Sequence, residues 1–443
     1  MATLQTGFAR IDVTPPLGTT LAGYYEVRHA DGILDPLLAT AIAFDDGDRR
    51  MVVISVDIIG FNQEMMNRVR KSIAERIGTE KEGVFVACTH THLGPCTADS
   101  SGKIENEDYI EVLIKKLGDA AELAVQDFAP TQMFYARGRV EGVAFVRRFR
   151  MKDGAVRTNP GWLNPEIDHP LGTPDEESSL VILKREGKPE IGIVNFQVHP
   201  DVISGCKISA DFPKFVRDTY ERHIPDSRCM YINGTQGDTN HIDVSLDESC
   251  CRRGYRRAKY MGEKIAMSVL GNYELARPLD DGKIFFGQTN ILVKYNKGRP
   301  EQIEEALRIS KRYREVGNVA EAVPYAKGMR CTEIVAEAER IVKLMEMPDE
   351  KELYVTAVSV GEVVFAGFPG EPFTDIGRGV KRGSKFTVTI PACCANGYEG
   401  YYPMERAFDE GGYEALTARY ACGTAEKLIE TSIALINTFG EQV

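Results

Sequence analysis

Residues 83–95 read Gly-Val-Phe-Val-Ala-Cys-Thr-His-Thr-His-Leu-Gly-Pro, and they guide the interpretation of the whole chain. The apolar run from Val84 to Ala87 predicts a strand buried on both faces, with a turn at Gly94-Pro95. Ligands bind at the carboxyl ends of strands in open α/β sheets. His90 and His92 are two positions apart, so in extended chain they point to one side and can serve one metal ion. Two surface histidines at a strand end are the simpler alternative.

The composition is that of an ordinary globular protein, with 443 residues of which 43% are hydrophobic and 27% charged. The net charge of -11 and the pI of about 5.4 argue against a nucleic-acid partner, which normally needs a basic surface. No apolar run approaches the roughly 18 residues of a membrane span, and the first residues do not read as a signal peptide. We therefore expect a cytoplasmic protein with no transmembrane segment.

Strand and helix patterns alternate on the N-terminal side of the two histidines. Residues 51–57 form a second apolar run that ends at Asp57, and residues 62–77 keep helical spacing up to Gly78. An apolar strand, an amphipathic helix and another apolar strand in succession are typical of α/β architecture. The sequence predicts an α/β fold with mixed, mainly parallel sheets flanked by helices.

Residues 298–347 have a different composition, rich in Glu, Arg, Lys and Ala. This segment predicts a helical insertion of two helices packed over the core. A lid, an oligomer contact and a plain peripheral hairpin are all compatible with the pattern, and the hairpin is the simplest of the three. A homo-oligomeric assembly therefore stays open.

Several other apolar runs also end in side chains that can bind a metal or take part in catalysis, namely His199, Asp238, Glu371 and Tyr398. Zinc accepts imidazole nitrogen and carboxylate oxygen, and a catalytic zinc site keeps room for a water that ionises near neutral pH. Arg147 lies in a basic stretch, and the simpler explanation of this stretch is a basic edge exposed to solvent. The planar guanidinium of Arg147 also suits binding of a substrate carbonyl or carboxylate. A metal hydrolase is one interpretation of this set.

Six motifs occur in the order seen in the neutral/alkaline, non-lysosomal ceramidase family, which the chain resembles from residue 7 to about residue 415: Thr89-His-Thr-His-Leu-Gly-Pro95, His199-Pro200, Ser209-Ala-Asp-Phe-Pro213, Asn233-Gly-Thr-Gln-Gly-Asp238, Phe368-Pro-Gly-Glu-Pro-Phe373 and Ala395-Asn-Gly-Tyr398. Members of this family are zinc amidases that split N-acylsphingosine into a fatty acid and a sphingoid base. The resemblance implies a zinc cofactor and one catalytic domain over residues 1–443, without the C-terminal immunoglobulin-like domain of full ceramidases.

The resemblance also implies roles for individual residues. The zinc ligands would be His90, His199, Glu371 and Tyr398. Beside the metal, His92 and Arg147 would hold the scissile carbonyl or transfer a proton, and Asp238 would orient the water or a ligand. The candidate substrate contacts are Tyr24, Thr239 and Tyr401.

One departure from the family concerns the nucleophile. Ceramidases carry a serine in the turn after the Gly-Asp pair, where this chain has Asn240, and Thr239 is the neighbouring hydroxyl. We therefore expect a zinc-dependent amide hydrolase that uses metal-activated water, with Asn240 at the catalytic position. Its substrate would be a lipid N-acyl amide or, alternatively, a small soluble amide, ester or lactone. A non-catalytic relative that keeps the metal site is the third hypothesis.

Overall fold

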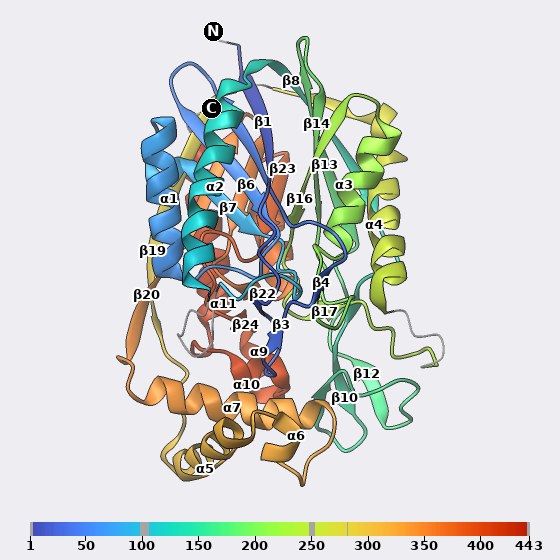
Figure 1. The fold of residues 1–443 in the computed structure, drawn as a ribbon, viewed down its shortest axis with the longest axis vertical. Coiled ribbons are helices and arrows are strands. Elements are labelled where there is room, and N and C mark those ends of the chain that lie inside the picture. Colours follow the sequence, from blue (N-terminus) through green and yellow to red (C-terminus); the bar gives the residue numbers. More distant parts are fainter. Residues whose placement is uncertain (1–2, 98–105, 248–252, 281, 441–443) are drawn as a thin grey trace.

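The computed structural model describes residues 3–97, 106–247, 253–280 and 282–440 (Figure 1). Its largest element is a nine-stranded sheet with the order β16-β14-β13-β8-β1-β5-β6-β7, to which β18 adds at β8. The strands of this sheet are β1 (Gln5–Asp12), β5 (Leu38–Asp45), β6 (Arg50–Val56), β7 (Val84–Cys88), β8 (Ala129–Arg139), β13 (Glu177–Arg185), β14 (Glu190–Phe196), β16 (Ser227–Asn233) and β18 (Arg277–Leu279).

The predicted mixed α/β class is confirmed, but the balance of strand directions differs from the prediction. In the large sheet β6 pairs with β7 and β14 with β16 in parallel. The other strand pairs of this sheet, within the described residues, are antiparallel. The expectation of mainly parallel sheets is therefore wrong for this sheet.

Four helices cover one face of the large sheet: α1 (Gln63–Ile77), α2 (Glu107–Gln126), α3 (Phe212–His223) and α4 (Gly254–Leu270). Val84 and Val86 of β7 point into this helical layer. The helix expected over residues 62–77 is confirmed as α1. The Asn62 side chain caps its start by accepting a hydrogen bond from Met65 N (2.8 Å), and Gly78, whose φ is 68°, ends it.

A second sheet covers the opposite face, with the order β19-β20-β21-β23. Phe85 and Ala87 of β7 pack against it, so this strand is buried on both faces, as its apolar run predicts. Its strands are β19 (Ile284–Lys294), β20 (Glu350–Val360), β21 (Val363–Gly367) and β23 (Val388–Ala392), and its outer face carries α8 (Thr374–Gly383) and α11 (Thr424–Gly440). The result is four layers in the order helices, sheet, sheet, helices.

The helical insertion has three helices instead of the expected two: α5 (Pro300–Val316), α6 (Val319–Ala322) and α7 (Met329–Met345). They lie at the end of the molecule opposite both chain termini and share a small core of their own (Figure 1). Tyr313 donates a hydrogen bond to the carbonyl of Tyr25, and Asn318 Nδ2 donates one to Glu26 Oε1 at 2.9 Å. The insertion therefore supports the loop around Tyr24.

Across the described ranges, no helix has both the length and the apolar character needed to cross a bilayer.

Candidate metal centre

His90 lies just beyond the end of β7, in a sharp bend of the chain. Its φ is 73°, a left-handed conformation that is uncommon for a residue with a side chain. The bend is held because His90 N donates to Ile58 O (3.0 Å) and His90 Nδ1 lies 2.7 Å from Ile59 O. A carbonyl oxygen is only an acceptor, so Nδ1 carries the proton in this contact and Nε2 is left with its lone pair. The bend thus presents Nε2 as a ligand atom.

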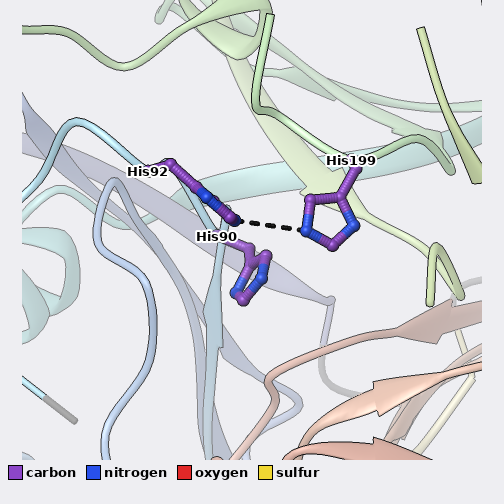
Figure 2. Close-up of side chains that lie close together, drawn as sticks. All are labelled: His90, His92 and His199. Carbon is purple, nitrogen blue, oxygen red and sulfur yellow. Dashed lines mark hydrogen bonds between the residues drawn. The ribbon is translucent and has the colours of Figure 1, made fainter. Parts of the chain in front are cut away.

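His199 and His92 complete a buried group of three imidazoles (Figure 2). His199 follows β14, and His92 follows His90 by two residues, so all three rings come from the ends of strands in the large sheet. Their ligand atoms lie within 4.8 Å of one another. His92 Nε2 and His199 Nε2 are 3.2 Å apart and face each other, with the His90 ring beside them. The geometry expected from the strand ends is present.

Glu371 brings a carboxylate to the same point. It lies in β22 (Glu371–Pro372), which pairs in parallel with β24 (Tyr401–Tyr402). Glu371 Oε2 is 3.3 Å from His90 Nε2 and 3.6 Å from His199 Nε2, yet this buried oxygen accepts no hydrogen bond. Tyr398 donates from Oη to the other carboxylate oxygen at 2.8 Å. The predicted ligand set therefore converges on one place.

The spacing of these atoms fits a tetrahedral metal ion. Nitrogen and oxygen ligands about 2.0 to 2.1 Å from zinc lie about 3.3 Å from one another in a tetrahedron. The separations of His90 Nε2 and His199 Nε2 from Glu371 Oε2, 3.3 and 3.6 Å, are close to that value. The orphaned Oε2 of Glu371 is a second sign of fit, because a cation would satisfy a buried oxygen that has no donor.

Burial and neighbouring charges together set the protonation of these groups. Burial lowers the pKa of His92 and of His199 well below the usual range, so both rings are neutral near pH 7. Burial alone would raise the pKa of the Glu371 carboxyl, but His90, His199 and Arg147 together hold it well below its usual range. Burial likewise opposes protonation of His90, but the Glu371 carboxylate raises the pKa of this ring. A divalent metal ion requires neutral imidazoles and an ionised carboxylate, so an ion bound here would take the place of that proton.

Arg147 is buried beside the histidines and is fixed by several contacts. Its Nε donates to Glu414 Oε1 at 2.6 Å, and its Nη2 donates to Gly237 O at 2.8 Å. The guanidinium carbon also lies 5.4 Å from the ring centroid of Tyr401. Glu414, in α10 (Tyr413–Thr417), carries no sequence signal that distinguishes it from the other acidic residues of a helix. Arg147 is thus a fixed positive charge at the site.

Tyr24 and Asp201 adjoin His92 on the other side. The Tyr24 hydroxyl donates to Asp201 Oδ1, and that oxygen lies 3.7 Å from His92 Nδ1. The rings of Tyr24 and His92 meet edge to face with centroids 5.6 Å apart. Gly23 permits this approach, because a Cβ there would lie 2.5 Å from the His92 ring. The sequence interpretation did not include Asp201, although its place two residues after His199 could have indicated it.

The other three predicted site residues point elsewhere. Asp238 Oδ1 accepts hydrogen bonds from Thr374 N (2.8 Å) and Thr374 Oγ1 (2.7 Å), so it holds the first turn of α8. Thr239 is fully buried, and its Oγ1 donates a hydrogen bond to Gln236 O at 3.3 Å. Asn240 donates to Asn159 Oδ1 at 2.8 Å and accepts from Ile242 N at 2.9 Å. Both polar atoms of Asn240 are therefore engaged within the protein.

No model of a known protein family matches the sequence. A crystal structure of neutral ceramidase from Pseudomonas aeruginosa superposes with a TM-score of 0.76 at 16% identity, covering 100% of this chain and 75% of that one.

The chain adopts a neutral ceramidase-like fold.

A second structure, of a ceramidase complexed with C2, gives a TM-score of 0.73 at 15% identity and covers 100% of this chain and 76% of its own. The resemblance drawn from the ordered motifs is thus confirmed at the level of the fold. The ceramidase-like fold brings the motif residues His90, His199, Glu371 and Tyr398 together, although they come from distant parts of the chain.

Proposed function

We propose that this protein is a zinc-dependent hydrolase of N-acyl amides. The observation that carries the proposal is the convergence of two imidazole nitrogens on the unpartnered Oε2 of Glu371, at 3.3 and 3.6 Å, inside a ceramidase-like fold. His90, His199 and Glu371 would hold the ion, and Tyr398 would be the fourth ligand. A bound zinc ion would supply a water of lowered pKa and would polarise the substrate carbonyl.

Arg147 would stabilise the negative charge that develops on the carbonyl oxygen. Its guanidinium is buried and is fixed by Glu414 and the Gly237 carbonyl, so it would not need to reorganise during the reaction. A fixed charge in a buried site acts more strongly than the same charge in water.

His92 would transfer the proton to the leaving amine. Its Nε2 faces the other imidazoles, and its buried Nδ1 has no hydrogen-bond partner but lies 3.7 Å from Asp201 Oδ1. The carboxylate of Asp201 would stabilise the imidazolium that forms when His92 accepts a proton. Tyr24 would hold Asp201 in place through its hydroxyl.

The test is metal content together with amide hydrolysis. We expect about one zinc per chain by elemental analysis, and hydrolysis of at least one N-acyl amide from a panel that runs from short soluble amides to ceramide. His90→Ala and Glu371→Ala should each weaken zinc binding by about 100-fold or more and abolish hydrolysis. His169→Ala, which removes an exposed imidazole, should change neither property.

Replacement of His92 separates two arrangements of the site. If His92 transfers protons, His92→Ala keeps the zinc and loses most of the activity; if it is a ligand, as its 3.2 Å distance to His199 permits, the zinc is lost as well. A folded protein that takes up no divalent metal would overturn the whole proposal. Zinc binding without hydrolysis of any amide in the panel would instead indicate a non-catalytic relative.

A further inference from the structure

The ligand atoms of the candidate metal centre are closed off from solvent. Glu371 and the three histidines are between 1% and 8% exposed, and Glu371 Oε2 is buried. A substrate, and the metal ion itself, can reach these atoms only when a covering segment moves. His92 lies nearest to solvent, because its side chain is 10% exposed and those of His90 and His199 are each 2% exposed. Access to the centre is therefore expected on the side of His92.

A short hairpin covers His92. It consists of β2 (Thr20–Leu21), the connecting residues 22–27 and β3 (Arg28–His29). The connection lies directly on the imidazole: a Cβ at Gly23 would be 2.5 Å from the ring, and the Tyr24 ring meets it edge to face. Arg28 Nη2 also donates to His92 O at 2.8 Å. This hairpin thus closes the side from which the metal centre is nearest to solvent.

The tip of the hairpin, residues 23–27, is only lightly packed. Four of its five residues are exposed, among them Tyr24 at 41% and Val27 at 69%. On the side of the metal centre, the Tyr24 hydroxyl donates to Asp201 Oδ1. Segments that bury few apolar side chains are the ones that open locally while the rest of a protein stays folded. The tip therefore has the properties of a segment that opens.

The helical insertion holds this tip from the other side. Tyr25, the partly buried residue of the tip, packs against the core of α5–α7, and its ring centroid lies 6.2 Å from that of Tyr313. The Tyr313 hydroxyl donates to the carbonyl of Tyr25, and Asn318 Nδ2 donates to Glu26 Oε1 at 2.9 Å. Tyr313 belongs to α5, and Asn318 is the residue before α6. Two consecutive residues of the tip are thus fixed by the insertion.

We propose that the hairpin is a gate to the metal centre and that the insertion is the clamp that keeps it closed. The gate opens when the tip leaves Tyr313 and Asn318, and the strength of these two contacts sets the fraction of molecules that are open. The helical insertion therefore controls access of substrate and metal. This inference rests on the metal centre of the proposed function, but not on the kind of bond that is cleaved.

The test weakens the clamp and leaves the metal ligands untouched. Tyr313→Phe removes one hydroxyl donor and keeps the aromatic ring. Asn318→Asp removes the other donor, and its new carboxylate repels that of Glu26. The oxygen that accepts from Ala320 N and Glu321 N is kept, so α6 retains its cap. The matched control, Tyr325→Phe/Arg308→Gln, changes two exposed side chains elsewhere in the insertion.

Two rates measure opening in the zinc-loaded protein: the removal of zinc by excess chelator, and amide hydrogen exchange within residues 20–29. For Tyr313→Phe/Asn318→Asp we expect both rates to rise at least about fivefold, because two hydrogen bonds that favour the closed gate are lost. The kcat/KM for an N-acyl amide should rise as well, since only the open form admits the substrate. Exchange in β7 should stay unchanged, and the control should match the wild type in every measurement.

Unchanged zinc removal or unchanged exchange in the double variant would overturn the gate. A parallel rise of exchange in β7 would also overturn it, because that pattern indicates global destabilisation instead of local opening. If the protein binds zinc but hydrolyses no amide, the amidase function fails, and the two rates still decide about the gate. If it binds no zinc, the proposed function fails, and a rise of exchange confined to residues 20–29 still supports the clamp.

Discussion

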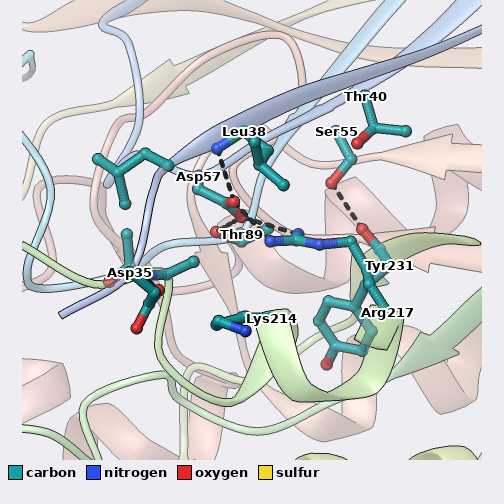
Figure 3. Close-up of polar contacts among 12 residues, drawn as sticks. Asp35, Leu38, Thr40, Ser55, Asp57, Thr89, Lys214, Arg217 and Tyr231 are labelled. Atoms are coloured by element: carbon teal, nitrogen blue, oxygen red, sulfur yellow. Dashed lines mark hydrogen bonds and ion pairs between the residues drawn. The ribbon is translucent and has the colours of Figure 1, made fainter. Parts of the chain in front are cut away.

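Replacing Arg217 with methionine tests how the loop that carries His90 is held. Arg217 lies in α3 and donates to both oxygens of Asp57, from Nη1 to Oδ1 at 3.0 Å and from Nη2 to Oδ2 at 2.7 Å (Figure 3). Thr89, the residue before His90, donates to Asp57 Oδ1 at 3.1 Å, and Leu38 N donates to Oδ2 at 3.0 Å. One buried carboxylate thus joins β5, α3 and the end of β7.

The expected cost follows from burial. The side chains of Arg217 and Asp57 are 3% and 0% exposed, so the methionine variant leaves a carboxylate in the core with two of its four hydrogen bonds. Removing one partner of such a pair costs about 3 to 5 kcal/mol, whereas replacing both charges can be nearly neutral. The double variant Asp57→Asn/Arg217→Met should therefore be more stable than Arg217→Met alone, by about 1 to 3 kcal/mol.

Urea unfolding with and without saturating zinc measures these effects. We also expect Arg217→Met to weaken zinc binding by about 10- to 100-fold, because the turn at Thr89 loses part of its anchor. Arg222→Met removes an exposed arginine from the same helix and should cost less than about 0.5 kcal/mol. A cost below about 1 kcal/mol for Arg217→Met, or a double variant less stable than that single variant, would refute the reasoning.

Three further outcomes are expected. Zinc at a free concentration of 100 times its Kd should raise the unfolding free energy by about 2.7 kcal/mol, and a chelator should remove this gain. Thermal melting with zinc and with chelator measures the difference. Gly237→Ala should weaken zinc binding and destabilise the fold by about 1 to 3 kcal/mol, because its Cβ would lie 2.5 Å from Glu371 O, whereas Gly271→Ala has room. Asp127→Asn should cost about 1 kcal/mol at pH 7. Burial alone would raise the pKa of Asp127, but Lys188 and Arg185 lower it in the folded state. The stability difference between the wild type and Asp127→Asn should therefore shrink as the pH falls below about 4, as unfolding curves at several pH values would show. A difference that grows on acidification would contradict that assignment.

The sequence was sufficient to predict the strand ends that carry the site. The apolar run before His90 predicts β7 and its burial on both faces, and His90 and His92 follow from local spacing. The direction of the other strands was not predictable in this way. In a four-layer fold the second sheet covers the face that an antiparallel strand often exposes, so β5 and β13 are buried on both faces and lack the usual alternation. A continuous apolar run therefore does not distinguish parallel from antiparallel pairing here.

The partners of the site residues were harder to predict, because they come from remote parts of the chain. Glu414 reaches Arg147 across 267 positions, and nothing in its own neighbourhood marks it. Local pattern locates ligands at strand ends, while the residues that orient them are set by tertiary packing.

Helix α3 contacts both loops that bring histidines to the site. At its start, Asp211 accepts hydrogen bonds from Val202 N (3.0 Å) and Ile203 N (2.9 Å), just after His199, and one turn and a half later Arg217 holds Asp57 and through it Thr89. A buried polar network of this kind is rigid only when its groups are satisfied. Since the same helix fixes both loops, a shift of α3 changes the position of His90 relative to His199. Metal affinity should therefore respond to substitutions in the core around α3 that lie outside the ligand set.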